Sequence, residues 1–174
     1  IHADNDAFGI NRRIYVSNEN KAVPDDVFGE VKERLQAIAQ FGPACGRPDP
    51  DAGRVLAQMQ LQREFGLRRE ESYKLNPTRD FRDDGSLQVI SGTKGGRPRV
   101  IEGPFSVQQK AALENIKLYM TRRGSSIPYG MREEAWRGKY DRIVREAGLT
   151  KRKSGCTSHG LRHKYAQERY TQLS

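Results

Sequence analysis

The sequence predicts an α+β domain that is mainly helical and carries one small antiparallel β-hairpin. Most of the chain places apolar residues three and four positions apart, which is typical of amphipathic helices. A single pair of short segments rich in β-branched residues flanks a glycine-rich connection. The chain has 174 residues, which is enough for one domain with a sizeable core and rarely for two.

Three helices are predicted in the first half of the chain. Residues 1–22 are polar without a clear period and are expected to be a linker or tail. Pro24 begins the first helix, and Gly42-Pro43 ends it after an apolar stripe. A loop over residues 45–50 leads to a second helix, from about Ala52 to Phe65, which Gly66 ends. A short third helix spans residues 69–75 and ends at an Asn-Pro pair.

The period then changes from helical to alternating. Residues 87–91 and 98–102 read as two strands, and residues 92–97 form a glycine-rich connection with Lys94 near its tip. We therefore expect a β-hairpin with a basic tip.

Helices return after this hairpin. Ser106 and Gln109 have the spacing of a capping box, which predicts a helix start. A strong apolar stripe follows from Trp136 to Ala147. A basic loop, residues 151–153, then leads to a last helix that begins at Ser158 and continues nearly to the end of the chain.

The positive charge is concentrated in the last third of the chain. Residues 1–116 contain 17 Lys and Arg against 17 Asp and Glu, whereas residues 117–174 contain 14 against 5, which accounts for the net charge of +9. This asymmetry favours a polyanionic partner, above all nucleic acid, with a solvated basic face as the alternative. No apolar run could span a membrane or act as a signal peptide. The two cysteines do not make a disulfide framework, so a reducing, cytoplasmic setting is expected.

The most informative motif is Ser-His-Gly-Leu-Arg-His at residues 158–163. If Ser158 caps the last helix, His159 and Arg162 lie in its first turn, where free backbone N–H groups and the helix dipole favour an anion. Two other places offer similar groups. Arg68 stands at a helix start with Glu71 three positions on, so that the carboxylate could hold the guanidinium fork. Lys94 is a mobile cation between glycines.

These motifs, in this order, resemble those of the tyrosine recombinase family, also called the phage integrase family. Members carry a catalytic Arg in a Gly-Leu-Arg turn, with an acidic residue three positions on and a Leu seven on, which match Arg68, Glu71 and Leu75. A catalytic Lys on a β-hairpin follows, matched by Lys94. The His-x-Leu-Arg-His box is matched at residues 159–163. The resemblance covers the chain from Pro24 to its end and assigns residues 23–174 to an integrase catalytic domain that lacks its C-terminal end.

The resemblance implies site-specific recombination of duplex DNA through a 3′-phosphotyrosyl intermediate, without a cofactor. Arg68 and Arg162 would stabilise charge on the phosphate, Lys94 would protonate the leaving 5′ oxygen, and His159 would manage the proton of the nucleophile. Glu71 and His163 would support these groups from behind. Candidate contacts to the DNA backbone, with a solvated surface as the alternative, are Arg69, Arg97, Arg99, Lys151, Arg152 and Lys153.

The sequence departs from the family pattern at the nucleophile. The family's Tyr lies a few dozen residues beyond the Arg of the box, whereas this chain ends twelve residues after Arg162. Tyr170 is only eight residues past that Arg and is predicted to be an ordinary member of the same helix. We therefore expect a fragment that binds DNA without cleaving it. The family resemblance further implies a full-length protein that is bacterial or phage-encoded, cytoplasmic and nucleoid-associated, and that forms a homo-tetramer on its attachment site.

Two other interpretations remain open at this point. Cys156, His159 and His163 have the spacing C-x2-H-x3-H, which could hold a zinc ion, although a fourth ligand is not near and Arg162 would repel a cation. A DNA-binding module without catalysis would explain the basic last third equally well. It would not require Arg68, Lys94 and His159 as a set.

Overall fold

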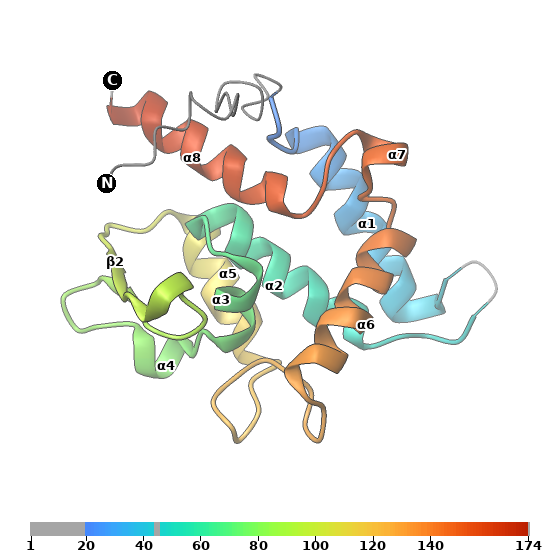
Figure 1. Cartoon of the computed structure of the whole chain (residues 1–174), viewed down its shortest axis with the longest axis horizontal. Helices are drawn as coiled ribbons and strands as arrows, with labels where there is room; N and C mark the ends of the chain where they lie inside the picture. The colour runs from blue at the N-terminus through green and yellow to red at the C-terminus, as the bar shows by residue number, and fades with distance from the viewer. Residues whose placement is uncertain (1–19, 44–45, 174) are drawn as a thin grey trace, which may run out of the picture.

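The computed structural model describes residues 20–43 and 46–173 and confirms the predicted class: helices with one two-stranded antiparallel sheet (Figure 1). Residues 1–19 of the predicted tail and Cys45 lie outside the described residues, while Ala22 is buried. The elements are α1 (Asp25–Phe41), α2 (Asp51–Phe65), α3 (Arg69–Lys74), α4 (Pro77–Asp80), β1 (Leu87–Val89), the 3-10 turn η3 (Lys94–Gly96), β2 (Arg99–Ile101), α5 (Val107–Lys117), α6 (Glu133–Glu146), α7 (Lys151–Ser154) and α8 (His159–Leu173).

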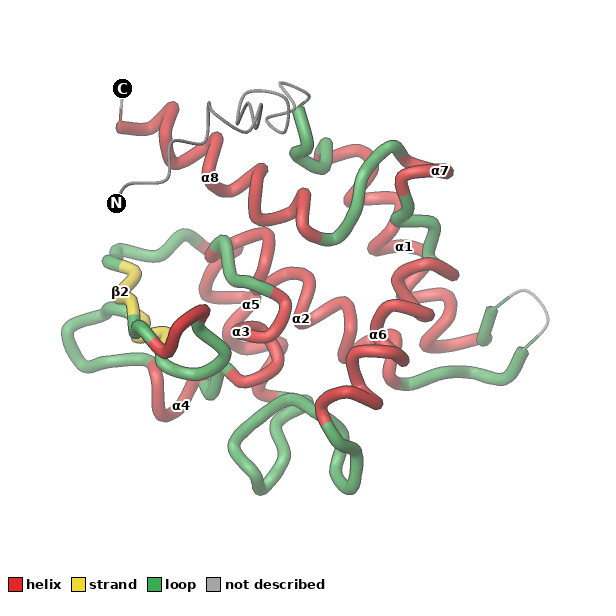
Figure 2. The backbone as a smooth tube through the Cα atoms, in the orientation of Figure 1, coloured by secondary structure: helices red, strands yellow, loops and turns green. Residues whose placement is uncertain are grey.

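Helix α2 is the centre of the fold, with α1, α3, α5, α6 and α8 packed around it (Figure 2). Most of its residues are small or apolar, and it is buried on nearly every side. Its first half contributes Val55 to a core with α1 and α6 that includes Leu35 and Trp136. Its second half contributes Phe65 to a second core with the hairpin and α5. One helix thus joins the two cores that carry the site elements.

The helix ends follow the local sequence signals. Pro24 precedes α1, and Gly42 ends it with a φ of 84°. The predicted capping box is confirmed, because Ser106 Oγ accepts from the Gln109 N–H at 3.1 Å and Gln109 Oε1 accepts from the Ser106 N–H at 2.9 Å. Of the helices in the described ranges, none combines the length and apolar character needed to cross a membrane.

Two short helices were not expected. The predicted break at Asn76 is instead the start of α4, because the Asn76 side chain accepts hydrogen bonds from the next two free N–H groups. The predicted basic loop is the single turn α7, capped by the Thr150 side chain. Both helices are one turn long, so apolar periodicity could not reveal them.

The hairpin is shorter than predicted. Its register pairs Leu87 with Ile101 and Val89 with Arg99, so β1 ends before residue 90 and β2 begins only after residue 98. Residues 90–98, called here the hairpin connection, contain η3 near the N-terminal end of α3 (Figure 1). The connection leaves the strand conformation at its glycines, several of which have positive φ.

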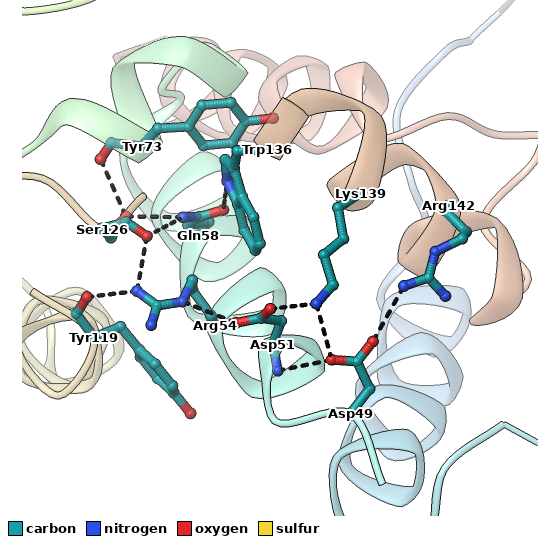
Figure 3. A network of polar contacts seen from close by, with 10 residues as sticks. All are labelled: Asp49, Asp51, Arg54, Gln58, Tyr73, Tyr119, Ser126, Trp136, Lys139 and Arg142. Carbon is teal, nitrogen blue, oxygen red and sulfur yellow. Dashed lines mark hydrogen bonds and ion pairs between the residues drawn. The ribbon is translucent and has the colours of Figure 1, made fainter. Parts of the chain in front are cut away.

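A buried polar network holds the loop between α5 and α6 onto the central helices (Figure 3). Ser126 Oγ accepts from Gln58 Nε2 at 2.8 Å and donates to the Tyr73 carbonyl at 3.1 Å. Gln58 also accepts from the Trp136 indole at 3.2 Å, and Arg54 donates to the Ser126 carbonyl at 2.9 Å. The network therefore links α2, α3 and α6 and fixes how α3 sits on the core.

Candidate functional site

The turn between α2 and α3 presents Arg68. Gly66 ends α2 in the left-handed conformation, with a φ of 61°, and Arg68 begins α3 with extended backbone. Glu71, one turn along, is completely buried. Its carboxylate accepts from the Arg68 backbone N–H at 2.7 Å and from the Arg68 guanidinium at 2.9 Å. One carboxylate thus fixes both the start of α3 and the arginine.

The same carboxylate contacts two more arginines from distant elements. Arg99 Nη2 on β2 donates to Glu71 Oε2 at 2.6 Å, and Arg162 Nη1 on α8 lies 3.9 Å from that oxygen. Within the part of the chain that the structure describes, the buried atoms Arg162 Nη1 and Arg99 Nε make no hydrogen bond. Three guanidinium groups around one carboxylate leave an excess of positive charge with unused donors, which suits an anion.

A pocket opens beside Arg68 and Arg162. His159 and Arg162 reach it from the first turn of α8, as the sequence predicted. The residues that line it are Gln62, Leu67, Arg68, Arg69, Ser158, His159 and Arg162. Segments about ninety residues apart thus meet at a pocket that contains two of the three arginines around Glu71.

The environment sets the protonation states of His159 in the pocket and of Glu71 behind it. Burial alone would raise the pKa of the Glu71 carboxyl, but hydrogen bonds from the Arg68 backbone and from Arg99 outweigh it and hold this pKa below its ordinary value. Partial burial, together with the charges of His163, Arg162 and Arg68, lowers the pKa of His159. His159 is therefore neutral at pH 7 and able to accept a proton, while Glu71 is ionised.

Two contacts fix helix α8, which carries half of the pocket. The Val23 N–H donates to the Gly160 carbonyl at 3.2 Å. Arg63 on α2 donates to both carboxylate oxygens of Glu168 at 2.8 Å and to Asp25 at 2.8 Å. These bonds determine where the start of α8 lies against the Arg68 turn.

The buried Gln62 on the pocket wall was not predicted as a site residue. Gln62 Nε2 donates to Ser72 Oγ at 3.1 Å and to the Tyr140 hydroxyl at 2.9 Å. Ser158, predicted as a cap, also lines the pocket. A signal for Gln62 existed, because it follows Met59 by three positions on the apolar face of α2.

Lys94 lies at the start of η3 and is exposed. Lys94 is not among the described residues that line the pocket. The hairpin connection nevertheless packs on the turn that carries Arg68, because a Cβ added at Gly92 would lie 2.8 Å from the Glu70 carbonyl. Lys94 is therefore beside the site and not within it.

The other predicted residues are distributed around this pocket. Arg69 forms an ion pair with Asp141 at 2.7 Å, and His163 packs its ring edge-on against His159 at 4.8 Å between centroids. Tyr170 lies on the same helix as Arg162, as expected, and is 78% exposed. Of the predicted DNA contacts, Arg97, Lys151, Arg152 and Lys153 are exposed.

The zinc interpretation is not supported by the geometry. Among the described residues, no three His, Cys, Asp or Glu side chains gather as metal ligands. The Cys156 thiol instead points to the Ala22 carbonyl at 3.8 Å.

Comparison with known proteins agrees with this fold. The chain matches the sequence model of the family described as integrase over residues 20–168. Two solved structures of XerH site-specific recombinase have a similar fold, each with 19% identity. The pre-cleavage complex with difH substrate has a TM-score of 0.53 over 87% of this chain and 43% of that one. The post-cleavage complex with palindromic difH has a TM-score of 0.56 over 94% and 46%. The chain spans less than half the length of either, and no curated protein matches it.

Proposed function

Because the chain belongs to the integrase family, we propose that it forms most of the catalytic domain of a tyrosine recombinase that acts on one phosphodiester of duplex DNA. The observation that carries this proposal is the convergence of Arg68, His159 and Arg162 on one pocket with Glu71 behind them. The similar fold of a DNA-bound recombinase supports DNA as the partner.

The proposed reaction uses each group for one task. A tyrosine oxygen attacks the phosphorus, and a 3′-phosphotyrosyl bond forms as the bond from phosphorus to the 5′ oxygen breaks. Arg68 and Arg162 donate to the non-bridging oxygens, where negative charge grows in the transition state. Neutral His159 accepts the tyrosine proton, and Lys94 gives a proton to the departing 5′ oxygen. The covalent bond conserves the phosphodiester energy, so religation reverses these steps.

We propose that Tyr170 is not the nucleophile. It is eight residues beyond Arg162 on α8, about 12 Å along the helix axis at 1.5 Å per residue. Its side chain is largely exposed to solvent. The nucleophile would then come from a longer protein that contains this chain, acting as a homo-tetramer on its attachment site in a bacterial or phage-infected cytoplasm.

DNA binding by the chain is the first test. Fluorescence anisotropy with a labelled duplex should show weak binding that falls steeply between 50 and 200 mM salt, as expected of phosphate contacts. Binding that is unchanged by salt would contradict a backbone-led contact.

Covalent chemistry is the second test, and it separates a recombinase from a DNA-binding module without catalysis. The chain alone should give no covalent protein–DNA product, whereas the longer protein with its downstream tyrosine should trap one on the attachment site. An adduct on Tyr170 would refute the assignment of the nucleophile. Absence of any adduct with the longer protein would favour the binding module.

A further inference from the structure

Two arginines of the hairpin, Arg97 and Arg99, look equivalent in the sequence but have different surroundings. Arg97 is exposed in the hairpin connection. Arg99 is turned towards the site, and its Nη2 donates to Glu71 Oε2 at 2.6 Å and to the Gly66 carbonyl at 3.3 Å. Arg99 therefore bridges β2 to the turn that presents Arg68.

The hairpin connection has a second attachment to the same turn, on the other side of Lys94. Gly92 has a φ of 78°, and a Cβ placed there would lie 2.8 Å from the Glu70 carbonyl and from the Glu71 backbone nitrogen. Such a close approach excludes any side chain at this position. Gly92 precedes Lys94 by two residues and Arg99 follows it by five. The segment that carries Lys94 is thus fixed at both ends to the N-terminal turn of α3.

The geometry of Arg99 fits a structural link between β2 and the start of α3 better than a contact with DNA. One of its terminal nitrogens is shared between a fully buried carboxylate and a backbone carbonyl, and its Nε is itself buried. Such a guanidinium has fixed orientation, and moving it would leave one of three positive charges around Glu71 without its nearest partner.

We propose that Arg99 is a positioning residue that holds Lys94 within reach of the 5′ oxygen of a phosphate bound by Arg68 and Arg162. The proposal rests on the proposed recombinase function. Arg99, predicted from the sequence to contact the DNA backbone, would instead support proton transfer by Lys94.

A substrate pair tests this role directly in the longer protein proposed above. One duplex carries the ordinary 5′ oxygen at the cleavage site, and the other carries sulfur as the bridging 5′ atom. A thiol has a pKa near 8.5, so a sulfur leaving group departs without a proton donor. Single-turnover cleavage of both substrates is measured for the unchanged protein and for Arg99→Gln, Arg99→Lys, Arg97→Gln and Arg68→Gln.

We expect Arg99→Gln to slow cleavage of the oxygen substrate about tenfold or more and to leave the sulfur substrate within about twofold, because only the former needs general acid catalysis. Arg97→Gln removes the same charge two residues away, at an exposed candidate DNA contact, and should leave the ratio of the two rates unchanged, because weaker DNA binding slows both substrates alike. Arg99→Lys should fall between the unchanged protein and Arg99→Gln. Arg68→Gln should slow both substrates.

The ratio of the oxygen and sulfur rates does not depend on how much enzyme is folded, since misfolding lowers both equally. Gly92→Ala disrupts the close approach of the hairpin connection to Glu70 and should shift this ratio in the same direction as Arg99→Gln. Equal slowing of both substrates by Arg99→Gln, or no difference between Arg99→Gln and Arg97→Gln, would overturn the proposal. An unchanged protein that cleaves neither substrate would instead count against the recombinase function itself.

Discussion

The Glu71 carboxylate accepts two hydrogen bonds from Arg68, one from its backbone N–H at 2.7 Å and one from its guanidinium at 2.9 Å. The first bond satisfies a free N–H at the start of α3, and the second sets the direction of the arginine fork. The same acidic residue therefore stabilises the helix start and orients the site, so its replacement should affect stability and DNA binding together.

The substitution Glu71→Gln should lower the free energy of unfolding by about 1–3 kcal/mol, because a buried charged acceptor is lost. We expect the effect to shrink in acid. The folded-state pKa of Glu71 is below its ordinary value, so its contribution is complete above about pH 4.3 and is lost as the pH falls through the folded-state value. Urea unfolding of both proteins between pH 7 and pH 3 measures this.

A suitable control for that experiment is Glu70→Gln. Glu70 lies next to Glu71 in sequence, but its contact with Arg137 is 3.7 Å long and both side chains are 45% exposed. Exposed ion pairs contribute little, so the control should change stability by less than about 0.5 kcal/mol at every pH. Similar losses for the two variants would show that the buried carboxylate has no special role.

Binding to DNA should depend strongly on Arg162 and weakly on Arg169, which lies on the same helix but faces solvent. Arg162→Gln removes a donor aimed at the pocket and should weaken duplex binding about tenfold, with a salt slope reduced by about one. Arg169→Gln removes the same charge and should stay within about twofold. Anisotropy titrations at several salt concentrations distinguish the two, and equal losses would mean that net charge alone drives binding.

The sequence revealed the helices and the hairpin because their signals are local. Apolar spacing predicted the long helices, and a capping box fixed one start. Short α4 and α7 depend on single capping side chains, Asn76 and Thr150, and carry no apolar period. The pocket is different, since its members come from α2, α3 and α8. Only the family resemblance suggested that Arg68 and Arg162 would meet.

The role of Arg99 shows what strand register adds. Side chains on a strand alternate between faces, and Arg99 has the same parity as Ile101, which is buried. Arg99 was predicted only as a DNA contact, although this parity places it on the inner face of the hairpin, while Val100 between them is exposed. Parity could not identify Glu71 as the partner, because that contact depends on how the hairpin packs on α3.

We expect Ser126 to hold the loop between α5 and α6 against the central helices. Ser126→Ala removes a hydroxyl that accepts from Gln58 and donates to the Tyr73 carbonyl in a fully buried place (Figure 3). We expect a loss of about 1–2 kcal/mol in unfolding free energy, since both partners are left buried and less satisfied. The neighbouring Ser125→Ala is the control and should be near neutral. Thermal and urea unfolding measure this. Equal losses of unfolding free energy in Ser126→Ala and Ser125→Ala would show that the network does not stabilise the fold.

His159 should couple DNA binding to proton uptake. Burial and the neighbouring positive charges of His163, Arg162, Arg68 and Lys21 lower its pKa in the free protein. A bound phosphate brings negative charge to the same pocket and should raise that pKa, because an opposite charge favours the protonated form. Affinity should therefore increase as the pH falls from 8 to 6, by up to about tenfold for each pKa unit of difference between the bound and free protein.

His159→Gln should flatten this dependence. His163→Gln should retain most of it, because the His163 ring lies behind His159 and outside the pocket lining. Anisotropy titrations at constant ionic strength provide the measurement, and an equal pH dependence in His159→Gln would show that this histidine does not face the bound phosphate.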